Sequence, residues 1–248
     1  MSKKSIQKVV VAFAYAFWAA TAFLAAGLAV SIPLEQFASQ QLIDWLSAPL
    51  GSLTLAAVIY VLAALLVVMP FFLRRVPWRE ILGRLAISRR FKGKMLAWAL
   101  YAWGMYFLTS VMVAFVLSFV NLPGLNLQQQ QQVGFQNLAN GFEYVAAFVA
   151  LVVVAPVFEE VIFRGFLFGR IRERSGFWPS AILTSLTFAA LHGQVNVGID
   201  VFILSMFLCF LREKFDSIWP GVMVHALKNG LAYTLLFILP LYGIKLLQ

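Results

Sequence analysis

Seven long apolar runs, separated by short polar connections, constrain this sequence more than any other feature. A membrane-spanning helix needs about 20 apolar residues, and most of the runs are near that length or longer, whereas two are somewhat short. Hydrophobic residues make up 62% of the chain and charged residues 12%, although a globular domain is about one quarter charged. The sequence therefore predicts an all-α, polytopic transmembrane bundle of about seven helices, within a range of six to eight. The runs cover residues 9–32, 53–73, 95–120, 142–170, 178–192, 197–211 and 219–238.

The distribution of basic residues predicts the orientation of these helices. Residues 2–8 contain three lysines and residues 74–94 contain eight basic residues, whereas the connections 33–52 and 121–141 contain none. Because cytoplasmic loops are enriched in Lys and Arg, we expect an integral, multi-pass membrane protein with a cytoplasmic N-terminus. Contact with anionic lipid explains the net charge of +9, so no nucleic-acid partner is expected.

One apolar run contains three ionisable residues. In the segment APVFEEVIFRGFLFGR, Glu159 and Glu160 are followed by Arg164. Charged groups inside a bilayer are costly and usually mark a functional site. Glu160 and Arg164 have the i, i+4 spacing of an intrahelical ion pair, whereas Glu159 faces about 100° away from Glu160. We therefore expect Glu160 to pair with Arg164 and Glu159 to face elsewhere.

The chain contains two histidines, and both belong to short motifs on apolar helices. Phe188 precedes His192 by four residues, and His225 precedes Asn229 by four, so each pair shares one helix face. Either motif alone is weak, because a single buried histidine is more often a packed residue than a catalyst. The coincidence of both motifs favours a site.

The depth of these residues along their helices supports a common site. Glu159 and His192 are equally distant in sequence from the turn at residues 175–176, so each lies about 20 Å along its helix from that turn. Asn229 is a similar distance from the loop near Asp216, and His225 is one turn shallower. The sequence therefore predicts that Glu159, His192, His225 and Asn229 converge in one layer.

This set of side chains favours hydrolysis. Glu159 can act as a general base on water, and the histidines and Asn229 can serve as proton partners, metal ligands or oxyanion donors. Gly-x-Ser-x-Gly and His-Glu-x-x-His motifs are both missing from the sequence. We therefore expect water-dependent hydrolysis of a substrate that enters from the cytoplasmic side.

The ordered motifs resemble the CAAX protease and bacteriocin-processing (CPBP, or Abi) family. The resemblance extends from Ala155 to Asn229 and includes the surrounding segments APVFEEVIFRGFLFGRI and SIWPGVMVHALKN. It implies an intramembrane endopeptidase, with residues 142–248 as catalytic core and residues 1–141 as N-terminal membrane helices that carry the basic cytoplasmic loop 74–94. The implied catalytic residues are Glu159, His192, His225 and Asn229, with Glu160, Arg164 and Phe188 in support. The implied partners are the lipid bilayer and a peptide or protein substrate, lipidated in some members.

Metal dependence stays open at this point. A catalytic zinc site needs three protein ligands and a water, and His192, His225 and Glu159 are the side chains of the right kind. Members of the family are commonly described as metalloproteases. A divalent metal such as zinc is therefore one expectation, and a metal-free glutamate base is the other.

Two further functions are also consistent with the sequence. A CPBP-fold protein can act as a non-proteolytic scaffold or as a bacteriocin self-immunity protein, although such a protein has no physical need for both histidines. A proton-coupled transporter also uses buried carboxylates and histidines, but its usual internal repeats and broken helices are not evident here. Lys228 is expected to pair with an acid, or alternatively to lie near an anionic end of the substrate.

Overall fold

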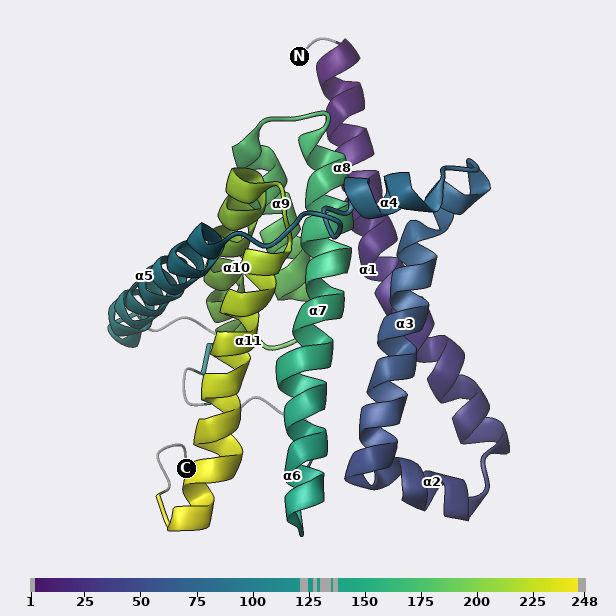
Figure 1. Cartoon of the computed structure of the whole chain (residues 1–248), viewed down its shortest axis with the longest axis vertical. Helices are drawn as coiled ribbons and strands as arrows, with labels where there is room; N and C mark the ends of the chain where they lie inside the picture. The colour runs from purple at the N-terminus through teal and green to yellow at the C-terminus, as the bar shows by residue number, and fades with distance from the viewer. Residues whose placement is uncertain (1–2, 121–124, 127–128, 130–134, 136–137, 245–248) are drawn as a thin grey trace.

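Helices arranged around a common long axis make up the computed structural model, and α5 (Gly93–Ser118) leans away from the others (Figure 1). The structure describes the chain except for residues 1–2, 121–124, 127–128, 130–134, 136–137 and 245–248. Most of the polar connection 121–141, predicted as a loop, therefore lies outside the described residues. The predicted all-α bundle is confirmed.

The described part of the chain contains six helices that are long and apolar enough to cross a membrane. A further apolar helix, α9 (Phe177–Ala190), has 14 residues. At 1.5 Å per residue it is about 21 Å long, shorter than a hydrocarbon core of about 30 Å. The prediction of about seven helices is thus confirmed, although one of them is too short to span. The six candidate spans are Ser5–Phe37, Pro49–Leu73, Gly93–Ser118, Gly141–Arg172, Val195–Phe215 and Trp219–Tyr242.

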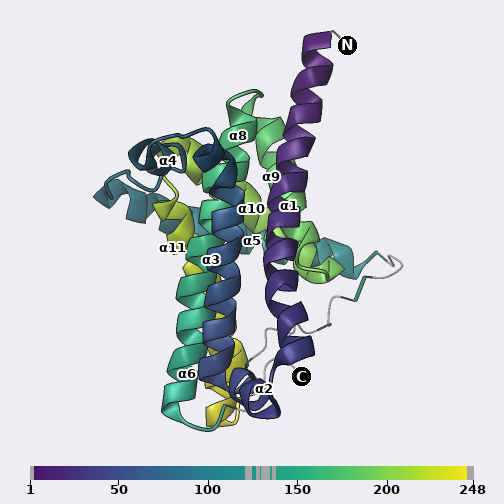
Figure 2. The same ribbon diagram turned by 90° about the vertical axis from the view of Figure 1, so that its right-hand side faces the viewer.

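The first two long helices, α1 (Lys3–Phe37) and α3 (Pro49–Leu73), form an antiparallel pair joined by α2 (Gln40–Ser47) (Figure 2). Small side chains let helix backbones approach closely in a membrane. The buried positions along the middle of α1 follow this rule, because they are alanines at helical spacing: Ala16, Ala19, Ala22 and Ala26. On its other side, α3 packs against the helix that carries Glu159 and Glu160.

That central helix is continuous from Gly141 to Arg172 but is not α-helical throughout. Two of its stretches are π-helical, with hydrogen bonds five residues apart instead of four. π-Helical segments occur frequently at functional sites, and here they flank and include the glutamates. In chain order the helix consists of α6 (Gly141–Phe148), η1 (Val149–Val154), α7 (Ala155–Glu159), η2 (Glu160–Phe168) and α8 (Gly169–Arg172).

The first π-helical segment has a cause in the sequence. The N–H group of Ala155 bonds to the carbonyl of Ala150, five residues back. The next bond in this register would join Pro156 to Leu151, but proline has no N–H group. The carbonyl group of Leu151 is therefore left without a partner from its own helix, and it becomes part of the site described below.

The basic connection between α3 and α5 contains a short helix, α4 (Trp78–Arg84). Ile81 and Leu85 are buried against the bundle, whereas Trp78 is exposed. The apolar side of α4 therefore packs on the bundle. A Cβ atom at Gly165 would lie 2.9 Å from the carbonyl oxygen of Leu85, so glycine permits this close contact with the central helix.

The last two long helices complete the bundle. Leu191 and His192 follow the end of α9, so His192 lies in a turn and not within the predicted helix 178–192. Next, α10 (Val195–Phe215) returns beside α9 and ends at Asp216 in a left-handed conformation, which Asp tolerates. α11 (Trp219–Tyr233), followed by η3 (Thr234–Ile238) and η4 (Leu239–Tyr242), packs against α5 and α10.

Candidate active site

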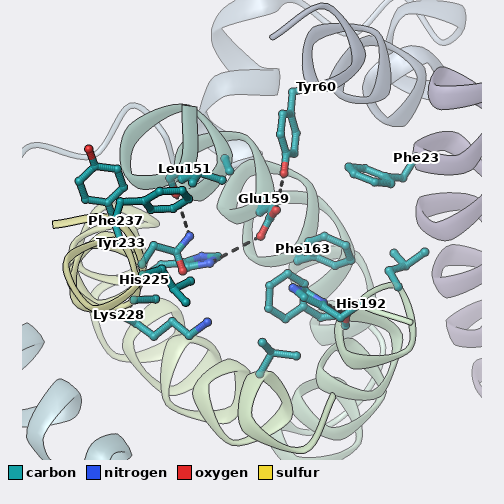
Figure 3. Close-up of a pocket in the computed structure, with 17 residues that line it drawn as sticks. Phe23, Tyr60, Leu151, Glu159, Phe163, His192, His225, Lys228, Tyr233 and Phe237 are labelled. Carbon is teal, nitrogen blue, oxygen red and sulfur yellow. Dashed lines mark hydrogen bonds and ion pairs between the residues drawn. The ribbon is translucent and has the colours of Figure 1, made fainter. Parts of the chain in front are cut away.

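A cavity of about 300 Å³ lies between α3, the central helix, α9 and α11. Figure 3 shows the polar side chains that converge on it. Four side chains were expected to meet at one depth, and all four line this cavity: Glu159, His192, His225 and Asn229. The structure therefore brings them together as predicted. The cavity also contains aromatic walls, including Phe163 and Phe188.

Glu159 lies in the cavity with both carboxylate oxygens oriented. Oε1 accepts a 2.5 Å hydrogen bond from the hydroxyl group of Tyr60, which comes from α3. Oε2 faces Nε2 of His225 at 3.6 Å. The side chain of Glu159 is 14% exposed, so it is enclosed by protein yet open to the cavity.

Glu160 points away from the cavity and is fully buried. Its Oε1 accepts a 2.8 Å hydrogen bond from Nη1 of Arg164, whose side chain is also 0% exposed. The ion pair expected from the i, i+4 spacing is thus confirmed. The same oxygen lies 3.1 Å from Nδ1 of His225, a contact that the sequence analysis did not anticipate.

The two carboxylates determine the orientation of His225. A carboxylate oxygen only accepts hydrogen bonds, so Nδ1 of His225 is the donor to Glu160. In the neutral ring Nε2 then carries the lone pair, and this atom faces Glu159. A carboxylate behind an imidazole fixes the tautomer and the ring orientation. Glu160 therefore connects the buried charge of Arg164 to a side chain in the cavity.

His192 is held by its own motif. Its Nδ1 lies 2.8 Å from the backbone carbonyl of Phe188, which only accepts, so Nδ1 is protonated and Nε2 is free to act as an acceptor. The ring of Phe188 packs edge to face against both histidines, at centroid distances of 4.7 Å to His192 and 5.8 Å to His225. The guanidinium group of Arg164 lies 4.6 Å from the centroid of the same ring. Phe188 therefore connects the two imidazoles to the buried ion pair.

Asn229 satisfies the carbonyl group that Pro156 leaves without a partner. Its Nδ2 donates a 2.9 Å hydrogen bond to the oxygen of Leu151. An amide nitrogen has two N–H groups, so one stays available to the cavity. The π-helical segment and the His-x-x-x-Asn motif are thus physically linked.

Part of the chain, including these site residues, is similar to known peptidases. Residues 141–231 match the family described as type II CAAX prenyl endopeptidase, Rce1-like. This match supports the resemblance of the chain to the CAAX protease and bacteriocin-processing (CPBP) family. A stretch of 77 residues is 26% identical to the putative membrane peptidase YdiL of Bacillus subtilis (strain 168). The alignment covers 31% of this chain and 32% of that protein, about a third of its length. No solved structure matches the chain significantly.

The six long apolar helices, together with the similarity to membrane peptidases, indicate an integral, multi-pass membrane protein. The family match includes Glu159, His192, His225 and Asn229. It does not include Tyr60, whose hydroxyl group contacts Glu159. The sequence analysis missed Tyr60. The available signal was a lone phenolic hydroxyl within the apolar run 53–73.

The expected zinc ligands His192, His225 and Glu159 share the cavity, but sharing a cavity does not make a metal site. Among the described residues, no group of three His, Cys, Asp or Glu side chains is arranged to hold a metal ion. Each histidine donates the N–H group at Nδ1 to a protein acceptor and keeps Nε2 free, as a metal-ligating imidazole also does. The zinc site therefore stays a prediction, and the chemistry proposed below uses the side chains of the protein alone.

Proposed function

We propose that this protein is an intramembrane endopeptidase that hydrolyses a membrane-anchored or lipidated peptide with water activated by Glu159. The observation that carries the proposal is the placement of Glu159, enclosed in the cavity between Tyr60 and His225. The similarity of residues 141–231 to the Rce1-like endopeptidase family, and of 77 residues to a putative membrane peptidase, supports a peptidase. The substrate is taken to be a peptide because the matched family and relative are described as peptidases, and the side chains in the cavity suit attack of water on its carbonyl group.

The chemistry follows from the side chains in the cavity. Glu159 takes a proton from water as the oxygen attacks the scissile carbonyl carbon, and the carbonyl oxygen becomes an oxyanion. The free N–H group of Asn229 donates to this oxyanion. When the C–N bond breaks, the proton on Glu159 passes to the leaving amine. The products are a new carboxylate and a new amine.

The histidines place the water and the substrate. Nε2 of His192 is the acceptor for a hydrogen of the water or of the substrate amide, since its Nδ1 is bound to the carbonyl group of Phe188. His225, held from behind by Glu160, keeps its Nε2 beside Glu159. Arg164 balances the charge of Glu160, so this second glutamate positions His225 without acting on the substrate.

Access to the site is proposed from the cytoplasmic side. The basis is the concentration of basic residues in the segment 74–94, which by the positive-inside rule lies in the cytoplasm together with the N-terminus. Cysteines introduced at position 84 and position 35, in a Cys209→Ala background, test this orientation. We expect labelling from opposite sides of the membrane, with position 84 cytoplasmic, and labelling from one side contradicts the proposal.

The decisive experiment incubates the purified, reconstituted protein with a library of membrane-anchored peptides and identifies fragments by mass spectrometry. We expect cleavage by the wild-type protein, and none by Glu159→Gln, His192→Ala or His225→Ala. Glu35→Gln, a change of an exposed glutamate at the end of α1, is the matched control and retains the wild-type rate. Absence of cleavage by the folded wild-type protein would instead favour the scaffold or self-immunity function.

A further inference from the structure

The corner between α3 and α4, residues 72–79, contains arginines that have no acidic partner. Within the described part of the chain, Arg74, Arg75 and Arg79 take part in no ion pair, and all three residues are exposed. The nearest acid along the chain, Glu80, is held by Arg84. The corner therefore has a positive charge that the protein itself does not balance. By contrast, arginines with acidic partners at the same end of the bundle are Arg84, Arg89, Arg170, Arg172, Arg174 and Arg212.

The backbone at Arg75 is unfavourable for any side chain. The N–H group of Arg75 bonds to the carbonyl of Phe72 at 2.9 Å, and that of Val76 bonds to Phe71 at 3.0 Å, which is the pattern of a Schellman motif. Arg75 has a φ angle of 54°. Glycine usually occupies this position, because a side chain is disfavoured in the left-handed region. The backbone therefore gives no reason for an arginine here, and its presence points to a use of the side chain.

Apolar side chains lie directly beside these charges. Leu73 is 75% exposed and Phe72 is 46% exposed, and the ring of Phe72 stacks on that of Trp78 at a centroid distance of 5.9 Å. Figure 1 shows α4 lying across the end of α3 and not along the axis of the bundle. The corner thus combines positive charge with an exposed apolar surface, as membrane-surface helices do.

The corner also lies where a membrane-spanning segment ends. The candidate span Pro49–Leu73 coincides with α3, and Arg74 is the next residue. Polar headgroups lie directly beyond the hydrocarbon core, so these arginines are at the level of the lipid phosphates. Basic residues directly after a membrane helix attract anionic lipids.

We propose that this corner binds an anionic phospholipid. The guanidinium groups of Arg74, Arg75 and Arg79 donate hydrogen bonds to the lipid phosphate, because the N–H groups of Arg match two phosphate oxygens at once. The acyl chains pack against Phe72 and Leu73. This lipid site goes beyond the peptidase function and does not depend on it, so either can fail without the other.

Binding of two lipids to the purified full-length protein in an uncharged detergent tests the site. Dioleoyl phosphatidylglycerol is anionic and dioleoyl phosphatidylcholine has no net charge, and binding of each is titrated by native mass spectrometry. Each basic residue near an anionic lipid surface strengthens attraction by about fivefold, so we expect phosphatidylglycerol to bind at least about tenfold more tightly. Glycerol phosphate carries the phosphate without acyl chains, and at the same concentration it should not displace the lipid.

Substitutions at the corner test the arginines themselves. The triple variant Arg74→Gln, Arg75→Gln, Arg79→Gln should lose the preference for phosphatidylglycerol. Replacement of the same residues by lysine keeps the charge and should retain the preference. Because all three residues are exposed, both variants should keep the melting temperature of the wild-type protein in detergent without added lipid.

The matched control removes the same amount of charge from the other end of the same connection. Arg90, Lys92 and Lys94 are also exposed and lie outside the corner. The triple variant Arg90→Gln, Lys92→Gln, Lys94→Gln should therefore bind phosphatidylglycerol as the wild-type protein does.

The outcomes distinguish a lipid site at this corner from general attraction by charge. A preference for phosphatidylglycerol that is lost in the corner glutamine variant and kept in the lysine and control variants supports the site. Equal binding of the two lipids overturns it, as does a preference that both glutamine variants reduce equally or that the lysine variant loses. Displacement of the lipid by glycerol phosphate would also overturn it, since the corner would then bind free phosphate.

Discussion

The hydroxyl group of Tyr60 and the carboxylate of Glu159 form a 2.5 Å hydrogen bond between residues that are 99 positions apart. Tyr60 is itself fixed by two neighbours, since its ring stacks on Phe158 at a centroid distance of 5.9 Å and meets the edge of Phe23 at 5.7 Å. The N-terminal helices thus form one wall of the site, although the family match begins only at residue 141. Tyr60 on this wall donates a hydrogen bond to Oε1 of Glu159, and Oε2 faces His225.

Tyr60→Phe tests this relationship. The change removes the hydroxyl group and keeps the ring, so Glu159 loses the contact that orients it. A hydrogen bond to a charged group contributes about 1.5–3 kcal/mol, and we expect kcat to fall by about 10- to 100-fold with little change in melting temperature. Tyr106→Phe is the matched control, because Tyr106 makes the same kind of bond to Asp200. Equal activity of Tyr60→Phe and wild type would show that Glu159 needs no support from α3.

The two adjacent glutamates should respond differently to the same substitution. Glu159→Gln removes the base but leaves a side chain of the same size that still faces the cavity, so cleavage is lost and the melting temperature is kept. Glu160→Gln leaves Arg164 without its charged partner, and loss of one partner of a buried ion pair costs about 3–5 kcal/mol. Glu160→Gln should therefore lose activity and have a lower melting temperature. We expect the same two effects for Arg164→Ala.

Cleavage rate and detergent melting temperature are measured for these three variants side by side. Destabilisation by Glu159→Gln, together with an unaffected Glu160→Gln protein, would reverse the two roles. Normal stability of all three would show that the buried pair contributes little, as some buried pairs do relative to their desolvation.

Gly221 permits the close approach of α11 to Glu160. A Cβ atom at this position would lie 2.8 Å from Oε2 of Glu160, and this carboxylate is fully buried and held by Arg164 and His225. Gly221→Ala should therefore displace Glu160, tilt His225 away from Glu159 and reduce kcat. Overpacking of this kind costs about 1–3 kcal/mol, so the melting temperature should also fall.

Gly230→Ala on the same helix is the control for this substitution. A Cβ atom there would meet Cγ1 of Val152 at 3.6 Å, an ordinary contact, and alanine in a helix is favoured over glycine by about 1 kcal/mol. We expect Gly230→Ala to be as stable as wild type or more so. If both variants behaved alike, the effect of Gly221→Ala would reflect helix propensity and not contact with Glu160.

Some of these relationships follow from the sequence because they are local. The spacing of Glu160 and Arg164 predicts their ion pair, and the apolar runs predict the helices, because both depend on helix geometry alone. The convergence of Glu159 and His192 at one depth also follows, since a hairpin fixes the distance of each from a shared turn. The cost of buried charge and the depth of the residues therefore point to the cavity, and the spacing points to the buried ion pair beside it.

Other relationships depend on how separate helices meet, which the sequence does not specify. Tyr60 reaches Glu159 because α3 packs against the central helix, and His225 reaches Glu160 because a glycine brings α11 close. The short α9 ends at Ala190, so His192 lies on a turn where a longer helix was predicted. The π-helical segments were also missed, although Pro156 marks the place where a backbone donor is missing.

The last prediction separates the structural role of Asn229 from its catalytic role. Asn229 bonds to the carbonyl group of Leu151 at 2.9 Å, and this carbonyl lacks a helical donor because Pro156 has no N–H group. Asn229→Ala should therefore leave a partly buried acceptor unsatisfied and destabilise the fold by about 1 kcal/mol, in addition to removing the proposed oxyanion donor.

Pro156→Ala restores a backbone N–H group next to Leu151, so the double variant Pro156→Ala, Asn229→Ala should recover much of the lost stability. It should not recover cleavage, because the side-chain amide that donates to the oxyanion is still missing, and loss of one such donor typically reduces kcat by about 10²–10³-fold. Melting temperature and cleavage rate are compared for both single variants and the double variant. If the double variant cleaved as fast as Pro156→Ala alone, Asn229 would serve only to satisfy the carbonyl of Leu151, and the oxyanion donor would have to be another group in the cavity.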